Sequence, residues 1–215
     1  MKTLDVYNVG IGLRWNLLFR RLFVLPKWRR RLRNNNFTIL CNNCNAGVIT
    51  HDLGQAFNSP TVNLFFYGDH FFKFCENFEY YINQTLEIKD NPIYKPESDY
   101  PVCALGDLEL HFMHYNSFDE AKKTWDRRLK RISRNNIFVM WTFFSDTSDA
   151  LLERFEHLPF KNKVAFTERN CPNYPSSFWI RGFPDGLGVL TRFYGLSGKR
   201  IIDQFDYVAW LNGGK

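Results

Sequence analysis

The chain has 215 residues, 45% of them hydrophobic, and is therefore long enough to bury a substantial core. Its formal net charge of +6 is local, because eight basic and no acidic side chains lie between Arg14 and Arg33, which leaves 20 basic against 22 acidic residues elsewhere. This near-neutral body excludes a general polyanion binder, so nucleic acid is not an expected partner. Five cysteines without a secretion signal exclude a disulfide framework and indicate a cytoplasmic protein with reduced thiols.

Residues 10–33 predict a basic amphipathic helix. Its apolar positions, spaced for one helix face, are Ile11, Trp15, Leu18, Leu22 and Leu25. Pro26 is expected to interrupt the helix before a second basic turn. Apolar runs fall short of the roughly 18 residues of a membrane span, so we expect the segment to lie on the anionic inner face of the cytoplasmic membrane. The alternative is an ordinary first helix packed on the body. The residues expected to contact the membrane are Trp15, Arg20, Arg21, Trp28 and Arg30.

Strands and helices then alternate along the chain. Short apolar runs ended by turn residues predict buried strands at 37–41, 62–67, 136–142 and 163–167. Further strands are expected at 85–88 and 108–113, and helices at 69–82, 117–134, 148–158 and 201–211. This alternation predicts an α/β fold. We expect a single three-layer, Rossmann-like domain with a largely parallel or mixed sheet at residues 36–215, preceded by a basic helical extension at residues 1–35.

Small polar residues gather at the ends of the first two predicted strands. In open α/β sheets, ligands bind outside the carboxyl ends of the strands, and amides and hydroxyls there suit a sugar or a phosphate. The candidate substrate-binding residues are Asn42, Asn43, Ser59, Thr61 and Asn63. The alternative roles are structural: the asparagines cap the following helix or hold a tight turn, and the prolyl bond after Ser59 fixes an extended entry into the strand.

Cys44 is a candidate nucleophile. A thiol just past a strand end and near a helix N-terminus is expected to have a lowered pKa. It needs a base, for which strand order suggests His51 or His114; His51 is also a candidate substrate-binding residue. The alternative is a cysteine packed in a turn. Cys41 and Cys44 form a C-x-x-C pair, but no second pair is spaced to complete a zinc site, so no metal is expected.

Glu109 and His111 share one face of the predicted strand at 108–113, by the period of two, with Tyr115 further along. A carboxylate beside an imidazole can act as a general base and its orienting partner, so Glu109 is a candidate catalytic residue and His111 a candidate substrate-binding one. His114, at the carboxyl end of the strand, is the favoured catalytic residue, because strand ends meet ligands more often than strand middles. The alternative is a half-exposed strand face.

Several nucleotide and hydrolase motifs are missing. The sequence has no G-x-x-x-x-G-K-[ST], no G-x-G-x-x-G after a strand and no G-x-S-x-G. It also lacks the Asp-x-Asp with which many nucleotide-sugar transferases hold a divalent cation. A glycosyltransferase of this sequence is therefore expected to be metal-independent or of an unusual kind, with an activated donor such as a nucleotide sugar as its co-substrate.

The chain also resembles a bacterial family of exopolysaccharide biosynthesis proteins, found in capsule and surface-polysaccharide loci. The motifs that carry the resemblance, in order, are Asn42-Asn43-Cys44 with Gly47, Leu53-Gly54, residues 59–65 (SPTVNLF), residues 106–115 (GDLELHFMHY), residues 125–128 (WDRR) and residues 158–163 (LPFKNK). The resemblance covers residues 36–170 and implies a Rossmann-like α/β domain and a role in building surface glycans. It carries over no catalytic residue.

The residues and the resemblance together predict a transferase of surface-polysaccharide assembly. It would move a glycosyl, acyl or phosphoryl group from an activated donor to a glycan or lipid-linked glycan precursor. The competing hypothesis is a non-catalytic glycan-binding or scaffold protein, which a basic extension and a neutral body suit equally well. A deep polar pocket lined by Asn43, Ser59 and His114 favours the enzyme, and a shallow aromatic groove favours binding.

Overall fold

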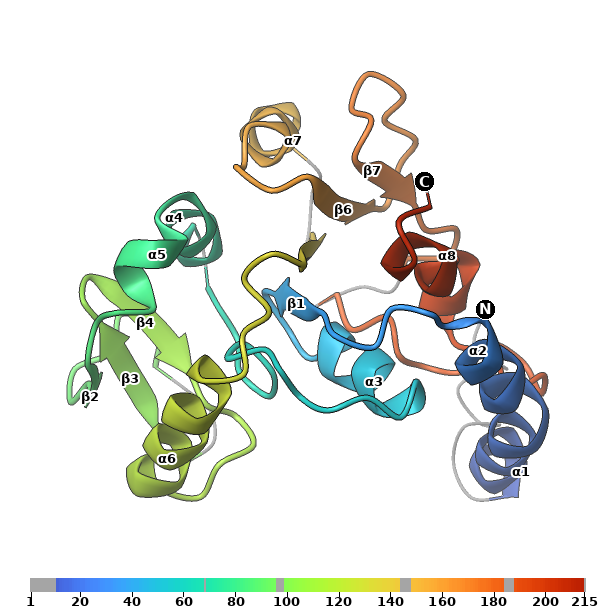
Figure 1. Cartoon of the computed structure of the whole chain (residues 1–215), viewed down its shortest axis with the longest axis horizontal. Coiled ribbons are helices and arrows are strands. Elements are labelled where there is room, and N and C mark those ends of the chain that lie inside the picture. Colours follow the sequence, from blue (N-terminus) through green and yellow to red (C-terminus); the bar gives the residue numbers. More distant parts are fainter. Residues whose placement is uncertain (1–10, 68, 96–98, 144–147, 184–187, 215) are drawn as a thin grey trace.

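The computed structural model describes residues 11–67, 69–95, 99–143, 148–183 and 188–214. These residues form an α/β fold in which a parallel four-stranded sheet lies between two groups of helices (Figure 1). A smaller antiparallel sheet lies at one end of the molecule, and the N-terminal helical segment lies at the other. The predicted α/β class with a largely parallel, Rossmann-like sheet is confirmed.

Alternating apolar side chains give the four-stranded sheet two buried faces. Its strands, in spatial order, are β1 (Thr38–Cys41), β5 (Ile137–Thr142), β6 (Asn162–Thr167) and β7 (Ser177–Trp179), and all neighbours are parallel. Along β1, Ile39 and Cys41 enter one apolar cluster and Leu40 enters the other; Met140 and Val139 of β5 divide in the same way. Strands buried on both faces are typical of parallel sheets that carry helices on each side.

Helices cover both faces of this sheet. One face is covered by α3 (Asn45–Asp52), the 3₁₀-helix η3 (Ile201–Gln204) and α8 (Tyr207–Leu211), against which α2 (Leu25–Arg31) packs. The other face is covered by α4 (His70–Glu76), α5 (Phe78–Tyr81), α6 (Phe118–Leu129) and α7 (Asp149–Glu156). The antiparallel sheet of β2 (Leu86–Ile88), β3 (Val102–Leu105) and β4 (Leu108–His111) packs on this second side. The helix expected at 201–211 is split, because Asp206 caps α8 by accepting a hydrogen bond from the N–H of Ala209.

The predicted second strand at 62–67 is wrong. Asn63 has a φ of 65°, a left-handed conformation that breaks an extended chain. At the outer edge of β1, the hydroxyl of Thr61 takes the place of a neighbouring strand. Its Oγ1 accepts a hydrogen bond from the N–H of Cys41 at 3.0 Å. The apolar run was misread because its side chains are buried between the two sheets without pairing as a strand of the parallel sheet.

The same run joins the two sheets. Phe65 forms an antiparallel bridge with His111 of β4, with N–O distances of 2.9 and 3.0 Å. The N–H of Phe66 donates to the carbonyl of Asn42, just past the end of β1, at 3.1 Å. The carboxyl ends of β1 and β4 are therefore held next to each other.

The N-terminal helical segment consists of α1 (Ile11–Phe19), the π-helix η2 (Arg20–Val24) and α2, and it does not stop before Pro26 as expected. A proline has no N–H to donate and its ring crowds the preceding turn. A π turn relieves this: the N–H of Leu25 donates to the carbonyl of Arg20, five residues back. The extra residue per turn also shifts the helix face, so that the buried positions run Asn16, Arg20, Leu25.

Candidate functional site

Cys44 and His114 meet where the two sheets join. Cys44 follows the end of β1 and occupies the N-cap position of α3 without a capping hydrogen bond from its side chain, and His114 lies in the turn after β4. Its Nε2 is 3.3 Å from the sulfur of Cys44. The thiol is half-buried and the imidazole is exposed, so the pair faces solvent at the carboxyl end of a sheet strand.

The thiol of Cys44 is protonated at rest. The sequence predicts a lowered pKa from the helix N-terminus, but burial raises the pKa of Cys44 above its ordinary value. The raised pKa favours the thiol over the thiolate, so the sulfur keeps its proton beside the imidazole. Such a pair reacts by transfer of the thiol proton to the imidazole as the sulfur attacks.

The asparagines beside Cys44 hold the backbone together. Asn42 donates to the carbonyl of Thr142 at 3.0 Å and accepts its N–H at 3.1 Å, which ties the end of β1 to the end of β5. Asn43 and Asn45 both donate to the carbonyl of Gly188, at 3.2 and 2.9 Å. All three side chains are buried. As placed, Asn42 and Asn43 serve the turn and the sheet rather than an open ligand pocket.

Ser59 and Thr61 are also buried and bonded to each other. Their hydroxyl oxygens are 3.0 Å apart, and Ser59 Oγ accepts the N–H of Thr61 at 3.2 Å. Asn63 is half-buried in the turn beside α3, and its Oδ1 would lie 3.6 Å from a Cβ added at Gly47. Of these predicted substrate-binding residues, Asn63 alone keeps part of its surface exposed.

Glu109 and His111 lie side by side on β4, as the period of two predicts. Glu109 Oε1 is 3.0 Å from His111 Nε2, and its two oxygens accept the N–H groups of Ile93 and Tyr94 at 2.7 and 3.0 Å. Burial acts to raise the pKa of Glu109, but these bonds, with an ion pair to Lys89, lower it below the ordinary value.

The imidazole of His111 is enclosed. Burial lowers its pKa against the opposing pull of Glu109. Tyr100, which the sequence did not single out, places its hydroxyl 3.2 Å from Nδ1 of His111. Because the carboxylate of Glu109 binds the loop between β2 and β3 and the imidazole has no exposed surface, this pair positions β4 and that loop rather than meeting a substrate directly.

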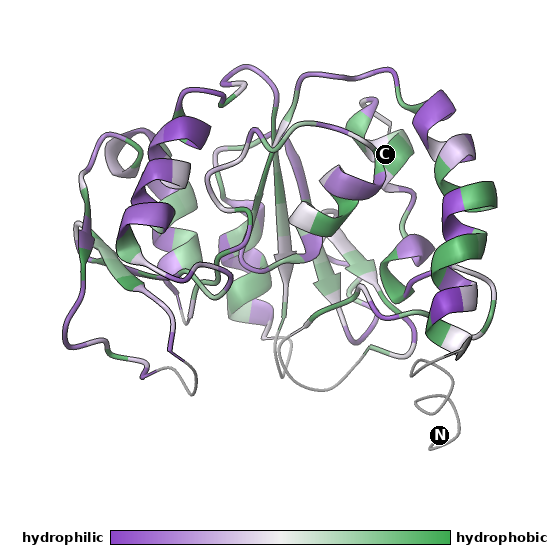
Figure 2. Cartoon of the chain, turned by 90° about the horizontal axis from the view of Figure 1, so that it is seen from below, coloured by the Kyte–Doolittle hydropathy of each residue, from purple (hydrophilic) through white to green (hydrophobic). Residues whose placement is uncertain are grey.

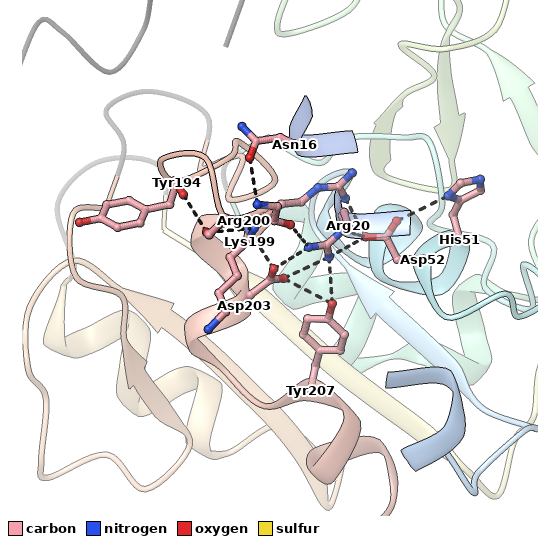
Figure 3. A network of polar contacts seen from close by, with 11 residues as sticks. Asn16, Arg20, His51, Asp52, Tyr194, Lys199, Arg200, Asp203 and Tyr207 are labelled. Carbon is pink, nitrogen blue, oxygen red and sulfur yellow. Dashed lines mark hydrogen bonds and ion pairs between the residues drawn. The ribbon is translucent and has the colours of Figure 1, made fainter. Parts of the chain in front are cut away.

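His51 lies apart from Cys44, beside a buried network of charges that we call the arginine network: Arg20, Asp52, Arg200, Asp203 and Tyr207 (Figure 3). Arg20 contacts Asp52 at 2.8 Å and Asp203 at 2.6 Å. His51 is exposed, with Nδ1 3.8 Å from Asp52. The network joins the N-terminal helical segment to α3 and to the C-terminal segment.

The N-terminal helical segment turns its apolar side chains outward, on what we call the outer face: Leu13, Trp15, Leu17, Leu18, Leu22 and Phe23, all exposed. Figure 2 shows this helix along the right edge of the molecule, with hydrophobic turns on its surface. Two predicted membrane contacts need correction. Arg20 is buried because Asp52 and Asp203 bind its guanidinium, and Trp28 packs edge-on against Tyr207. Arg21 and Arg30 are exposed, as is Trp15.

Arg128 of α6 was also not singled out from the sequence as a structural residue. It is buried, and its Nη1 donates to the carbonyl of Val62 at 2.6 Å and to the hydroxyl of Tyr115 at 2.8 Å. Arg128 and Arg20 were both missed because they bind residues that are distant in sequence.

For Arg20 the sequence did carry a signal. Asn16 and Arg20 are four residues apart and lie opposite the apolar stripe, which is the spacing of a second helix face.

In the part of the chain that the structure describes, no three His, Cys, Asp or Glu side chains gather closely enough to hold a metal ion. Among those same residues, none of the helices combines the length and hydropathy that crossing a bilayer requires. Buried charged side chains instead join the N-terminal helical segment to α3 and to the C-terminal segment.

Comparison with known proteins places the chain in a family. A protein of Haemophilus influenzae (strain Rd), described as "Uncharacterized protein", is 39% identical over 195 residues, which cover 90% of this chain and 92% of the relative. A family model described as "Domain of unknown function (DUF1919)" matches residues 17–212, from the N-terminal helical segment to the last helix. The chain is therefore a member of the DUF1919 family.

Proposed function

We propose that this protein is an acyltransferase of bacterial surface-polysaccharide assembly, with Cys44 as its nucleophile and His114 as its base. The observation that carries the proposal is the 3.3 Å contact between the sulfur and Nε2 at the carboxyl end of β1. A thiol and an imidazole at this separation are the minimal pair for covalent catalysis.

The proposed reaction has two balanced steps. Cys44 sulfur attacks the carbonyl carbon of an activated acyl donor while His114 takes the thiol proton; a thioester forms, and the donor's leaving group departs with that proton. A hydroxyl of the acceptor then attacks the thioester carbonyl while His114 takes the hydroxyl proton. The ester forms, the C–S bond breaks, and the proton returns to the sulfur.

Among glycosyl, acyl and phosphoryl transfer, this pair favours acyl transfer. A thiol protonated at rest is a good nucleophile toward a carbonyl once a base is at hand, because sulfur is intrinsically nucleophilic. Glycosyl transfer through a covalent intermediate commonly uses a carboxylate, and Glu109 is enclosed by backbone N–H groups. Support for a glycan or lipid-linked glycan as acceptor comes from the resemblance to exopolysaccharide biosynthesis proteins.

The proposal also includes a location: the enzyme acts at an anionic membrane surface, which it contacts through residues 10–33. The outer face and the exposed Arg21 and Arg30 support it, since a basic helix with an exposed apolar face favours the membrane interface. Lipid-linked acceptors are held at such a surface, so docking would bring the enzyme to them.

The chemistry is tested by incubating the full chain with p-nitrophenyl acetate, an activated acyl donor. The wild type is expected to release p-nitrophenol and to gain one acetyl group on the peptide that contains Cys44, found by mass spectrometry. Cys44→Ala and His114→Gln should lose both signals, and His51→Gln, which changes an exposed histidine of the same helix, should keep them. An acetyl group spread over other residues, or full acylation in His114→Gln, overturns the assignment.

The biological role is tested by deleting the gene in a bacterium that carries it and analysing the surface glycan by mass spectrometry. Loss of an acyl substituent, restored by the wild-type gene and not by Cys44→Ala, is the expected result. An unchanged polymer, with the gene shown to be expressed, overturns the role.

A non-catalytic glycan-binding or scaffold role is the second candidate. The observation that favours it is the state of the predicted pocket residues: Asn43 and Ser59 are buried and bonded, so they do not open a deep polar pocket beside His114. Full restoration of the glycan by Cys44→Ala would select this candidate over the enzyme.

A further inference from the structure

The outer face extends beyond the helix. The loop between Phe193 and Arg200 folds back onto α1, where Leu196 accepts a hydrogen bond from the indole N–H of Trp15 at 3.1 Å. Asn16 binds both ends of the turn, donating to Gly195 at 2.9 Å and accepting from Gly198 at 2.9 Å. Tyr194 and Leu196 of this loop are exposed, and Leu196 lies beside the exposed Trp15. Helix and loop therefore form one apolar surface.

This surface is fixed by polar groups beneath it. Gly198 sits so close to the helix that an added Cβ would lie 2.8 Å from the backbone nitrogen of Arg20. Arg20 in turn donates to the carbonyl of Gly198 at 2.9 Å and is bound to the arginine network. The apolar side chains cannot rotate inward without breaking these bonds, so the fold itself holds them in solvent.

Every charged side chain of the helix that carries the outer face is basic. Between residues 11 and 31 the sequence has no acidic side chain, and Arg14, Arg21, Lys27 and Arg30 are exposed. An apolar face of leucines, a phenylalanine and a tryptophan, edged by cations, matches an anionic lipid surface. A protein partner would instead need an acidic rim around an apolar centre.

A groove of about 320 Å³ opens at the end of the outer face, between η2 and the C-terminal segment. Phe19, Phe23 and Trp28 supply its aromatic walls, and Lys27 and Lys199 are among its lining residues. The three other charged side chains of the groove already have partners: Arg31 is paired with Asp206, and Asp203 is bound by Arg20.

The two lysines differ from these groups. Among the described residues, neither Lys27 nor Lys199 forms an ion pair, and both are exposed. Two unpaired ammonium groups in one groove suit a phosphate. Phe23, which belongs to both the groove and the outer face, gives a lipid chain an apolar path from the phosphate to the bilayer.

From these contacts we infer that the groove binds the phosphate headgroup of an anionic lipid while the outer face and Leu196 enter the bilayer. The inference rests on the proposed membrane placement and names its ligand class: a phosphate monoester or diester that carries an apolar chain. It does not depend on the chemistry of Cys44.

The test is co-sedimentation of the full chain with phosphatidylcholine vesicles, with and without phosphatidic acid. The wild type is expected to bind the anionic vesicles and to bind neutral ones weakly. Lys27→Ala with Lys199→Ala should weaken anionic binding by about tenfold or more, since each lysine near an anionic surface contributes to the attraction. Lys123→Ala on α6 with Lys130→Ala at the C-cap of this helix is the matched control with the same charge change, and it should weaken binding by about twofold or less.

The outcomes separate the layers of the proposal. If the wild type binds neither vesicle, the membrane placement falls, and acylation of Cys44 is judged separately. If it binds but both double variants weaken equally, binding is general electrostatics and the groove assignment is overturned. Soluble glycerol phosphate tests whether the phosphate comes from a lipid or from a soluble ester. If this ester binds without vesicles as tightly as the vesicles do, the groove is a site for a soluble ligand and the lipid assignment is overturned.

Discussion

The N-terminal helical segment and α6 are both amphipathic, yet they face the body in opposite ways. On α6, Trp125 is buried and Lys123 is exposed, as burial of apolar surface dictates. On the N-terminal segment, Arg20 is buried and Leu18 and Leu22 are exposed. A helix that packs through Asn16 and Arg20 gives up part of the usual hydrophobic gain, so its exposed apolar side chains are available for a partner outside the chain.

The comparison also shows what stabilises a helix that buries Arg20 and exposes Leu18 and Leu22. Burying a guanidinium is costly unless every charge around it is paired. Arg20 meets that condition, because it binds Asp52 and Asp203 and also donates to the hydroxyl of Tyr207 at 3.3 Å. Desolvation favours the neutral form, yet the paired carboxylates raise the pKa of Arg20 overall, so the folded state strongly prefers the charged arginine.

The largest expected effect comes from breaking this network. Arg20→Met leaves two carboxylates buried with incomplete partners and should lower the free energy of unfolding by about 3–5 kcal/mol, measured by urea denaturation. Arg21→Met, on the exposed side of the same helix, is the control and should change it by no more than about 0.5 kcal/mol. Equal, small losses in both variants would mean that the inverted packing does not depend on Arg20.

A second, smaller effect tests whether polar groups also hold the region beside Cys44. Asn42→Ala removes the two hydrogen bonds to the backbone of Thr142 and should cost about 1–3 kcal/mol, because the buried N–H and C=O are left without partners. Thermal unfolding measures the loss. An unchanged melting temperature, together with loss of activity, would return Asn42 to the role of a ligand-binding residue.

The cluster at β4 predicts a pH dependence. Burial lowers the pKa of His111, so between this value and the ordinary one of about 6.5 the unfolded chain binds more protons than the folded chain. The contribution of His111 to the free energy of unfolding is therefore fully present above about pH 6.5. It is lost as the pH falls through the pKa of His111 in the folded chain. His111→Gln should flatten this fall in urea titrations at several pH values. A profile as steep as that of the wild type would assign the effect to other groups.

The smallest expected change in stability comes from the outer face. Leu18→Ser with Leu22→Ser removes side chains that are already in solvent and should alter the free energy of unfolding by about 0.5 kcal/mol or less, seen in the same urea titrations. On α7, Leu152→Ala truncates a leucine that is buried and should lower the free energy of unfolding by about 2–5 kcal/mol. Comparable losses at both places would show that the outer face is packed in solution.

Much of the sheet could be predicted from sequence because its signals are local. The strands at 37–41, 136–142 and 163–167 are short apolar runs with turn residues at their ends, and the structure places strands there. The run at 62–67 carries the same signal but follows another path, since Asn63 turns the chain and the hydroxyl of Thr61 takes the place of a strand neighbour. Periodicity reports burial, and it does not report which backbone groups pair.

In the candidate site, too, some residues could be predicted from local signals and others could not. Strand order suggested His51 or His114 as a base for Cys44, and the structure brings His114 to the sulfur. The fate of Asn42 was not predictable, since its partner Thr142 is 100 residues away. The orientation of the N-terminal helix depends likewise on Asp52 and Asp203, which lie 32 and 183 residues from Arg20. Helical spacing reveals two faces, and only distant partners decide which one is buried.

The most direct test of the outer face as a membrane surface is the depth that Trp15 reaches in a bilayer. Trp15 and Trp179 are the two exposed tryptophans among the described residues, and they lie on different elements. In anionic vesicles whose lipid chains carry bromine, the fluorescence of the wild type should be quenched. Trp15→Phe should abolish most of that quenching and Trp179→Phe should preserve it. Equal quenching in the two variants, or none in the wild type, would contradict the claim that the N-terminal helical segment turns its apolar side outward to enter lipid.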